Sequence, residues 1–323
     1  MCFLAKFFSI LLFAPALAPG ALAQTYPDRP IRLIVPYPPA GPTDLIARAV
    51  SDRLGARLGQ QVVVDNRSGA ATVVGTELAA RSRPDGYTLL LATVTTLAIN
   101  PILKSKLPYD ADRDFTPISM LALQPYVMVT HLGLPATTVS QLVAYAKANP
   151  GKLSFASAGV GTGAHLATEL FLHMAGINMV HVPYKGSGPA TTDLIGGHVA
   201  LQFAGISAVR PHAQAGKLRM LAVSSARRSL AAPEVPTIAE SGIAGYEATS
   251  WNSLVAPRGT PRAIVDRLSA DVVAVLSQPE VRERLKQQGV DADPGTPAQL
   301  AAHIKLETAR FSRLIAAIGL KAE

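Results

Sequence analysis

Residues 31–48 read IRLIVPYPPAGPTDLIAR, and this stretch organises the rest of the chain. Ile31 to Val35 is an apolar, β-branched run of strand length, and the three prolines that follow prevent it from continuing as a strand or becoming a helix. Gly41 has no Cβ and permits a tight corner, while Pro42 suits the first position of a helix, where its missing N–H costs nothing. The stretch therefore predicts a strand, a rigid corner and a helix that begins at Pro42.

The corner in this stretch is a candidate site for an anion. The first N–H groups of a helix have no partner inside the helix and lie at the positive end of its dipole. A strand that leads through a tight corner into a helix directs these groups at one point. Asp44 lies in the first helical turn, with Arg48 one turn later at a favourable spacing. Taken alone, the stretch fits an ordinary strand-to-helix turn better, because such turns are common in α/β folds.

The first 23 residues have the pattern of a secretory signal peptide. Lys6 precedes the apolar run 7–17, and Ala21-Leu22-Ala23 supplies the small residues of a cleavage site. A membrane anchor is the alternative, but the run is interrupted by proline and is shorter than the ~20 residues that span a bilayer. We expect cleavage after Ala23 and a mature protein in the periplasm. The single cysteine, Cys2, leaves with the signal, so the mature chain has no thiol chemistry.

Length and charge limit the function further. About 300 residues remain after cleavage, which at ~150 residues per domain predicts two lobes. The formal net charge of +8 favours small anionic solutes, although a generally basic composition without functional meaning fits as well. The basic residues are scattered, and no Lys/Arg run alternates with aromatic residues, so we expect no nucleic-acid partner.

Strand and helix patterns alternate along the chain. Residues 31–92 read as strand, helix, strand, helix, strand, which predicts a parallel sheet with right-handed crossovers. A second series begins near residue 139, and the extended segments 115–130 and 246–256 connect the two. We therefore predict an α/β protein with two mostly parallel sheets, in which residues 24–124 and 247–323 form lobe 1 and residues 125–246 form lobe 2. Ligands of such sheets gather beyond the carboxyl ends of the strands.

Two helix starts in the C-terminal part look alike. Thr260-Pro261 and Thr296-Pro297 each predict a threonine N-cap followed by proline at the first helical position, and Gln299 completes a capping box with Thr296. We interpret both as stability features without chemistry.

A glycine-rich corner at 159–164 matches the G-x-G-x-x-G/A pattern of dinucleotide-binding proteins. That function needs an acidic residue about 20 positions later for the ribose, and the chain has Tyr184-Lys185-Gly186 there. Export also separates the protein from cytoplasmic dinucleotides. We therefore expect no cofactor, and we note that the same backbone can hold a carboxylate.

Catalysis and metal binding have little support in the sequence. A secreted hydrolase using Ser157 and His165 is the runner-up hypothesis, but the chain has no G-x-S-x-G elbow and nothing marks an activated nucleophile. His165 and His173 lie eight positions apart on one predicted helix, too far for one metal ion, and no H-E-x-x-H or cysteine set is present. We expect a binding protein rather than an enzyme.

Four motifs in fixed order carry a resemblance to a known family. They are residues 37–44 with Ala47-Arg48, residues 157–165, residues 182–186 with Pro189-Ala190, and Ala256-Pro257 with residues 259–261. Together they resemble the solute receptors of tripartite tricarboxylate transporters, the Bug or TctC-like family. The resemblance covers essentially the whole mature chain.

This resemblance implies a two-lobed periplasmic binding protein of type II, which closes like a Venus flytrap on a small organic carboxylate. It implies delivery of that ligand to a membrane permease of one large and one small subunit, and we expect a monomeric receptor. A sensing partner of a membrane signalling protein is an alternative output. In the family the first corner grips a carboxylate mainly through backbone groups and ordered waters, and the second-lobe corner completes the grip.

The chain departs from the family pattern at two positions. Ala40 stands where the family usually has glycine, and Ala204-Gly205 stands where an acidic or amide pair is frequent, which favours a ligand without an amino group. The expected ligand-binding residues lie in the corners and at strand ends: Tyr37, Pro39, Ala40, Gly41, Thr43, Asp44, Thr93, Thr95, Ser157, Gly159, Val160, Gly161, Thr162, His165, Tyr184, Lys185, Gly186 and Ala204.

Overall fold

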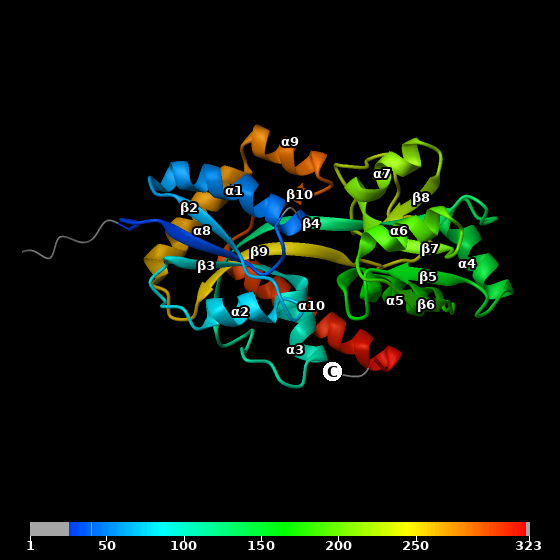
Figure 1. Ribbon diagram of the computed structural model, residues 1–323, viewed down its shortest axis with the longest axis horizontal. Coiled ribbons are helices and arrows are strands. Elements are labelled where there is room, and N and C mark those ends of the chain that lie inside the picture. The colour runs from blue at the N-terminus through cyan, green and yellow to red at the C-terminus, as the bar shows by residue number, and fades with distance from the viewer. Residues whose placement is uncertain (1–25, 40, 321–323) are drawn as a thin grey trace, which may run out of the picture.

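The computed structural model describes residues 26–39 and 41–320. The predicted signal peptide and Ala40 lie outside the described residues. Figure 1 shows an elongated molecule of two halves, which are joined by the long strands β4 (Phe115–His131) and β9 (Thr249–Pro257).

The first half is built around the stretch that opens the mature chain. Strand β1 (Ile31–Val35) lies between β2 (Val62–Asn66) and β3 (Thr88–Thr93) and pairs in parallel with both, as predicted. Helix α1 runs over Pro42–Leu58, with Pro42 in its first turn and Gly59 as a left-handed C-cap, so the predicted start at Pro42 is confirmed. Helix α2 (Val73–Ala80), the π-helical turn η1 (Thr95–Ile99) and helix α3 (Asn100–Leu103) complete this part.

The second half repeats the same construction. Strands β5 (Ser154–Ser157), β6 (Val180–Pro183) and β7 (Leu201–Gly205) are parallel neighbours, and β8 (Leu218–Val223) pairs with β4. The helices are α4 (Val139–Ala148), α5 (Gly163–Ala175), α6 (Ser187–Ile195) and α7 (Ile206–Gln214).

The C-terminal elements return to the first half. They are α8 (Arg262–Leu276), α9 (Pro279–Gln287), β10 (Asp291–Ala292) and α10 (Pro297–Ile318). Helices α1, α8 and α9 share a buried cluster on one face of the first-half sheet. Helix α10 packs on the opposite face with Trp251 of β9, and Leu166 of α5 belongs to the same cluster.

The two predicted sheets are in fact one mixed sheet. The described chain forms a ten-stranded sheet in which eight strands follow the order β2-β1-β3-β9-β4-β7-β5-β6, and β8 and β10 pair separately with β4. The reason is the length of β4, whose residues 115–125 pair antiparallel with β9 and whose residues 126–131 pair with β7 and β8. A strand shared by both halves joins their ladders into a single sheet.

The two threonine-proline pairs near the C-terminus, which look alike in sequence, differ in how they begin their helices. Thr296 forms the predicted capping box with Gln299 at the start of α10. Thr260 does not cap α8, since Pro261 is the N-cap residue and the Thr260 hydroxyl donates to the Pro257 carbonyl at 2.8 Å. The prediction of a threonine cap at residue 260 is therefore wrong. Within the described residues, no helix combines the length and apolarity needed to cross a bilayer.

Candidate functional site

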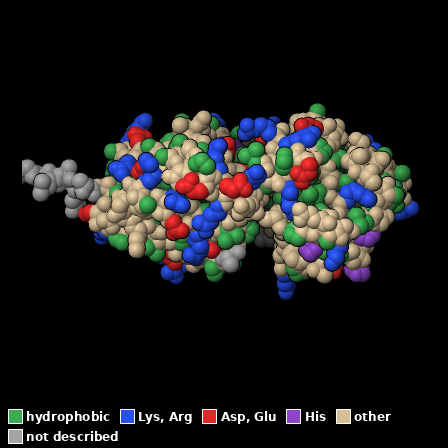
Figure 2. Space-filling model, turned by 90° about the horizontal axis from the view of Figure 1, so that it is seen from above, with side chains coloured by type: hydrophobic (Ala, Val, Ile, Leu, Met, Phe, Trp, Pro, Cys, Tyr) green, Lys and Arg blue, Asp and Glu red, His purple; other side chains and the backbone are tan. Residues whose placement is uncertain are grey.

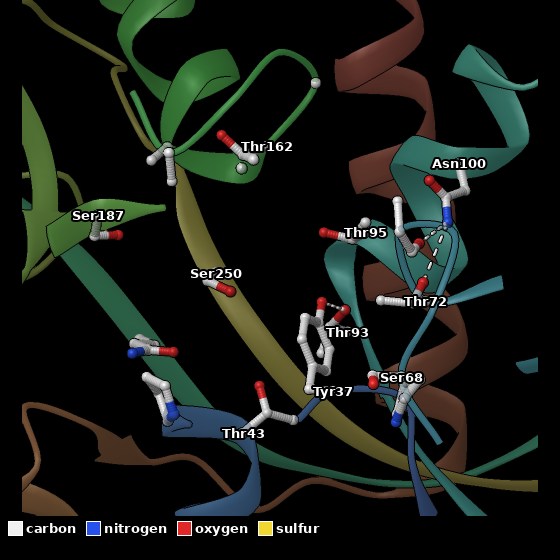
Figure 3. A pocket seen from close by; sticks show the side chains of 18 of the residues that line it. Tyr37, Thr43, Ser68, Thr72, Thr93, Thr95, Asn100, Thr162, Ser187 and Ser250 are labelled. Carbon is white, nitrogen blue, oxygen red and sulfur yellow. Dashed lines mark hydrogen bonds between the residues drawn. The ribbon is translucent and has the colours of Figure 1, made fainter. Parts of the chain in front are cut away.

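A cavity of about 730 Å³ lies where corners from both halves meet. Figure 3 shows Thr72, Thr95 and Asn100 on one side of it, Thr162 and Ser187 on the other, and Ser250 of β9 between them. Seven of the predicted residues line the cavity: Tyr37, Thr43, Thr93, Thr95, Val160, Gly161 and Thr162.

The starts of several helices line this cavity. Helix α1 contributes Pro42 and Thr43, α5 contributes Gly163 and Ala164, and the first turns of α6 and α7 contribute Ser187 and Ser207. Each such end carries N–H groups without helical partners and the positive end of a dipole. The arrangement suits an anion, because it places partial positive charge around a cavity without a buried cation.

The side chains around the cavity are mostly neutral. Among the described lining residues, Lys104 alone carries a formal charge, and none carries a carboxylate. The other polar side chains of the lining carry hydroxyl or amide groups, and its apolar side chains are mainly those of alanine, proline and leucine. The cavity can therefore hold an anionic group with an apolar body without repulsion from a fixed negative charge.

The first corner is held by bonds on its inner side. The Tyr37 hydroxyl lies 2.9 Å from Oγ1 of Thr93, and burial raises the pKa of that hydroxyl. The amide of Asn66 donates to the Tyr37 carbonyl at 3.1 Å and to Oδ1 of Asp44 at 2.9 Å. Arg48 also donates to Asp44, at 2.9 Å.

Asp44 was included among the expected ligand-binding residues, although its place in the first helical turn favoured a role at the helix end over direct ligand contact, and it does not line the cavity. Its side chain is 2% exposed and is occupied by Asn66 and Arg48. A carboxylate at a helix start stabilises the positive end of the dipole, and here it also joins the last residue of β2 to α1. Asp44 therefore stabilises the corner through its bonds to Asn66 and Arg48, without lining the cavity.

The second corner uses two of its own N–H groups internally. The Gly159 N–H donates to Ser157 Oγ at 3.1 Å, and the Gly161 N–H donates to His165 Nδ1 at 3.2 Å. Thr162 caps α5 by accepting from the His165 N–H at 3.3 Å. Gly163 and Ala164, the first two residues of α5, also line the cavity, one step further along the chain than the sequence predicted.

Ser157 and His165 are both buried behind this corner and do not line the cavity. The imidazole next to the Ser157 hydroxyl belongs to His181, at 2.7 Å, and not to His165. The His165 and His181 rings stack with centroids 4.0 Å apart, and burial, followed by the neighbouring His165, lowers the pKa of His181 to about 4. The pairing of Ser157 with His165 is therefore wrong.

The remaining predicted residues that the structure describes are not among those that line the cavity. Tyr184 donates to Asp193 at 2.6 Å, which raises its pKa to about 12, and Ala204 is buried in the core beneath α6 and α7. Ala40 is outside the described residues. The others that do not line the cavity are Pro39, Gly41, Gly159, Lys185 and Gly186.

The sequence prediction missed the segment 68–72, which lines the cavity after β2. Ala70, Ala71 and Thr72 all have positive φ, and Asn100 donates to the Ala71 carbonyl at 2.8 Å and to Thr72 Oγ1 at 3.2 Å. The position of this segment at the end of a parallel strand was a usable signal. The other lining residues that were missed include the polar residues Gln124, Tyr126, Ser187, Ser207 and Ser250.

Metal ligands and surface charge add little to the site. No group of three or more His, Cys, Asp or Glu side chains suited to a metal ion occurs in residues 26–39 and 41–320. Figure 2 shows Lys and Arg side chains interspersed with Asp and Glu over the face that it presents.

Known proteins are similar to this chain in sequence and in fold. The profile of the TctC family, described as "Tripartite tricarboxylate transporter family receptor", matches residues 46–320. Protein BugT of Bordetella pertussis is 40% identical over 313 residues, which cover 97% of this chain and 96% of BugT.

Two solved structures extend the comparison. The structure of R. palustris Rpa4515 with adipate has a TM-score of 0.81 at 36% identity, covering 92% of this chain and 100% of that chain. MatC (Rpa3494) from Rhodopseudomonas palustris with bound malate has a TM-score of 0.75 at 30% identity, covering 90% of this chain and 100% of that chain. The chain belongs to the TctC/Bug family of tripartite tricarboxylate transporter receptors, which are periplasmic solute-binding proteins.

Proposed function

We propose that this receptor captures a small organic carboxylate in the cavity and delivers it to the permease subunits of a tripartite tricarboxylate transporter. The observation that carries the proposal is the set of helix starts around a cavity whose described lining residues include no carboxylate side chain. Relatives of similar fold support it, since one is described with adipate and another with bound malate.

The proposed grip is electrostatic and needs no covalent step. The carboxylate oxygens accept hydrogen bonds from the N–H groups of Gly163 and Ala164 and from hydroxyl groups such as that of Thr43. Charge-assisted hydrogen bonds of this kind are about twice as strong as neutral ones. Bridging waters add contacts at small cost and let the same cavity accept acids of different length.

Capture is proposed to occur by hinge closure. Lobe 1 (residues 24–124 and 247–323) and lobe 2 (residues 125–246) rotate about β4 and the segment that leads into β9, so that α5 approaches α1 around the ligand. Strand β4 changes partner between Pro125 and Tyr126, which gives the rotation a structural location. The mature receptor, cleaved after Ala23, acts in the periplasm as a monomer.

No observation favours the hydrolase alternative. The Ser157 hydroxyl is buried and accepts from the Gly159 N–H while it bonds to His181. A nucleophile must reach the substrate, and Ser157 does not line the cavity.

The test is a binding screen of residues 24–323 by thermal shift, followed by calorimetry. The panel contains adipate, malate, tricarboxylates, aromatic acids and acidic amino acids, together with the corresponding amides as uncharged controls. We expect at least one acid to raise the melting temperature and its amide to have no effect. Stabilisation by an amide or a cationic solute, with none by any acid, would contradict the proposal. Uptake of the identified acid by cells with and without the permease genes then distinguishes transport from sensing.

A further inference from the structure

We infer that His181 is a positioning residue for the ligand site, acting through Ser157 on the corner 157–163. The inference rests on the proposed function in one respect, because it takes the start of α5 to contact the ligand. Nothing in the cavity itself requires His181, which does not line it.

Three flat rings form a stack behind this corner. Phe155 of β5 lies 4.7 Å from His181 of β6 between ring centroids, and His181 lies 4.0 Å from His165 of α5. The interplanar angles are 14° and 17°. The parallel pairing of Phe155 with His181 places the histidine beside the last residues of β5. The stack therefore links both strands to the first turn of α5.

Each imidazole fixes one glycine of the corner. His181 Nε2 bonds to Ser157 Oγ at 2.7 Å, and that oxygen accepts from the Gly159 N–H at 3.1 Å. His165 Nδ1 accepts from the Gly161 N–H at 3.2 Å, so the ring carries its proton on Nε2, which lies 3.4 Å from Glu169. The two glycines have φ of +135° and +73°, which glycine adopts without strain, and because glycine is also free to adopt many other conformations, these bonds select one shape of the corner.

The conformation of the corner 157–163 determines the direction of the N–H groups at the start of α5. Thr162 caps the helix and also donates to the Gly159 carbonyl at 2.8 Å, so the cap is tied to the glycine that Ser157 holds. Gly163 and Ala164 follow at the cavity. The path from His181 to the ligand therefore runs through Ser157, Gly159 and Thr162. Loss of the bond between His181 and Ser157 is expected to loosen the cap that Thr162 forms on α5.

Two substitutions at residue 181 separate the hydrogen bond from the ring stack. His181→Phe keeps a flat ring between Phe155 and His165 but loses the bond to Ser157. His181→Gln loses the ring but keeps an amide that can reach Ser157. Ser157→Ala removes the same bond from the other side, and the double variant Ser157→Ala/His181→Phe completes a thermodynamic cycle.

The first readout needs no ligand. Amide hydrogen exchange of residues 159–163 in the ligand-free protein is expected to be at least 10-fold faster in His181→Phe and Ser157→Ala, and close to wild type in His181→Gln. Unchanged exchange in His181→Phe overturns the inference, even if Ser157→Ala exchanges faster, because Ser157→Ala removes the acceptor of the Gly159 N–H directly. A protein that binds no carboxylate but shows this exchange pattern would contradict the proposed function and leave the positioning role supported.

The second readout is affinity, measured by calorimetry with adipate or with the tightest acid of the panel. We expect about 10-fold weaker binding in His181→Phe and in Ser157→Ala, no further loss in the double variant, and rescue to within 3-fold by His181→Gln. Additive losses, or weaker binding in His181→Gln than in His181→Phe, would show that the ring and not the bond matters, and would overturn the inference.

Discussion

The hydroxyl of Tyr37 lies 2.9 Å from Oγ1 of Thr93, so a bond between two side chains fastens the corner after β1 to the carboxyl end of β3. Both residues line the cavity. Thr93 Oγ1 also lies 3.1 Å from Thr96 Oγ1, which extends the connection into η1. The two strand ends of the first half therefore present one rigid wall to a ligand.

Removing this bond is expected to weaken both the fold and the site. Tyr37→Phe keeps the ring and deletes the hydroxyl, and a lost buried hydrogen bond costs about 1 kcal/mol. We expect that loss in the free energy of unfolding by urea, together with ligand affinity about 5-fold weaker by calorimetry. Tyr184→Phe is the matched control, because its hydroxyl bonds to Asp193 away from the cavity lining. Equal losses of affinity in Tyr37→Phe and Tyr184→Phe would contradict the placement of Tyr37 at the ligand-binding cavity.

Gly161 is expected to tolerate no side chain without loss of binding. It has φ of +73°, and a Cβ there would lie 3.1 Å from Leu103 Cδ1 in the other half of the molecule. Gly161→Ala should cost about 1–2 kcal/mol of stability and reduce affinity at least 10-fold, and Gly161→Val should abolish binding with the fold retained. Circular dichroism and calorimetry check both.

The control for this strain is Gly176→Ala at the end of α5. Gly176 has φ of +62° with open space around its Cβ position, so the backbone cost is similar and the cavity is untouched. Its affinity should equal that of the wild type. Unchanged affinity in Gly161→Ala would mean that the second corner does not contact the ligand.

The low pKa of His181 predicts a loss of stability in acid. Burial, and then the neighbouring His165, lower its pKa from 6.5 to about 4, so the unfolded chain takes up the proton at a higher pH than the folded protein does. The stability of the wild type relative to His181→Phe should fall by about 1–2 kcal/mol between pH 7 and pH 4, allowing for partial solvent screening. Urea denaturation across this pH range measures the free energy of unfolding of both proteins. The same change with pH in wild type and His181→Phe would refute the prediction.

A buried ion pair on α10 predicts the largest single effect on stability. Arg310 lies 2.9 Å from Glu307, whose side chain is 3% exposed, and donates to the Glu247 carbonyl at 2.9 Å just before β9. Arg310→Met leaves Glu307 buried without its partner, so we expect a loss of about 3 kcal/mol in the free energy of unfolding.

Two comparisons make this prediction specific. Burial raises the pKa of Glu307, so the loss in Arg310→Met should shrink as the pH falls and the carboxylate is protonated. Arg262→Met removes a pair with Asp266 in which the arginine side chain is 91% exposed, and should change stability by less than about 0.5 kcal/mol. Similar losses in the two variants would show that burial of the pair is unimportant.

Local chemistry made part of this structure predictable. The prolines after Val35 and the glycine after Leu58 set the bounds of β1 and α1, because each acts through its own backbone geometry. The same holds for the capping box of Thr296. Thr260 has the same neighbours, but its hydroxyl bonds to Pro257, because the preceding strand brings that carbonyl within reach.

Partners distant in sequence were not predictable. Ser157 precedes His165 by only eight positions, yet it bonds to His181, because the register between β5 and β6 decides which ring is adjacent. The site residues at 68–72 and at Ser250 depend on which strand ends face the same cavity. The merging of two sheets into one depends on β4 changing partners along its length.

The place of β9 in the sheet constrains the order in which the polypeptide can acquire its structure. Strand β9 lies between β3 and β4, although more than a hundred residues separate it from β4 along the chain. Until residues 249–257 are inserted, β3 and β4 expose open edges on which other chains can aggregate. The second half can pair its own strands earlier, so we expect its amides to gain protection first during refolding, with insertion of β9 as the late step that completes the molecule.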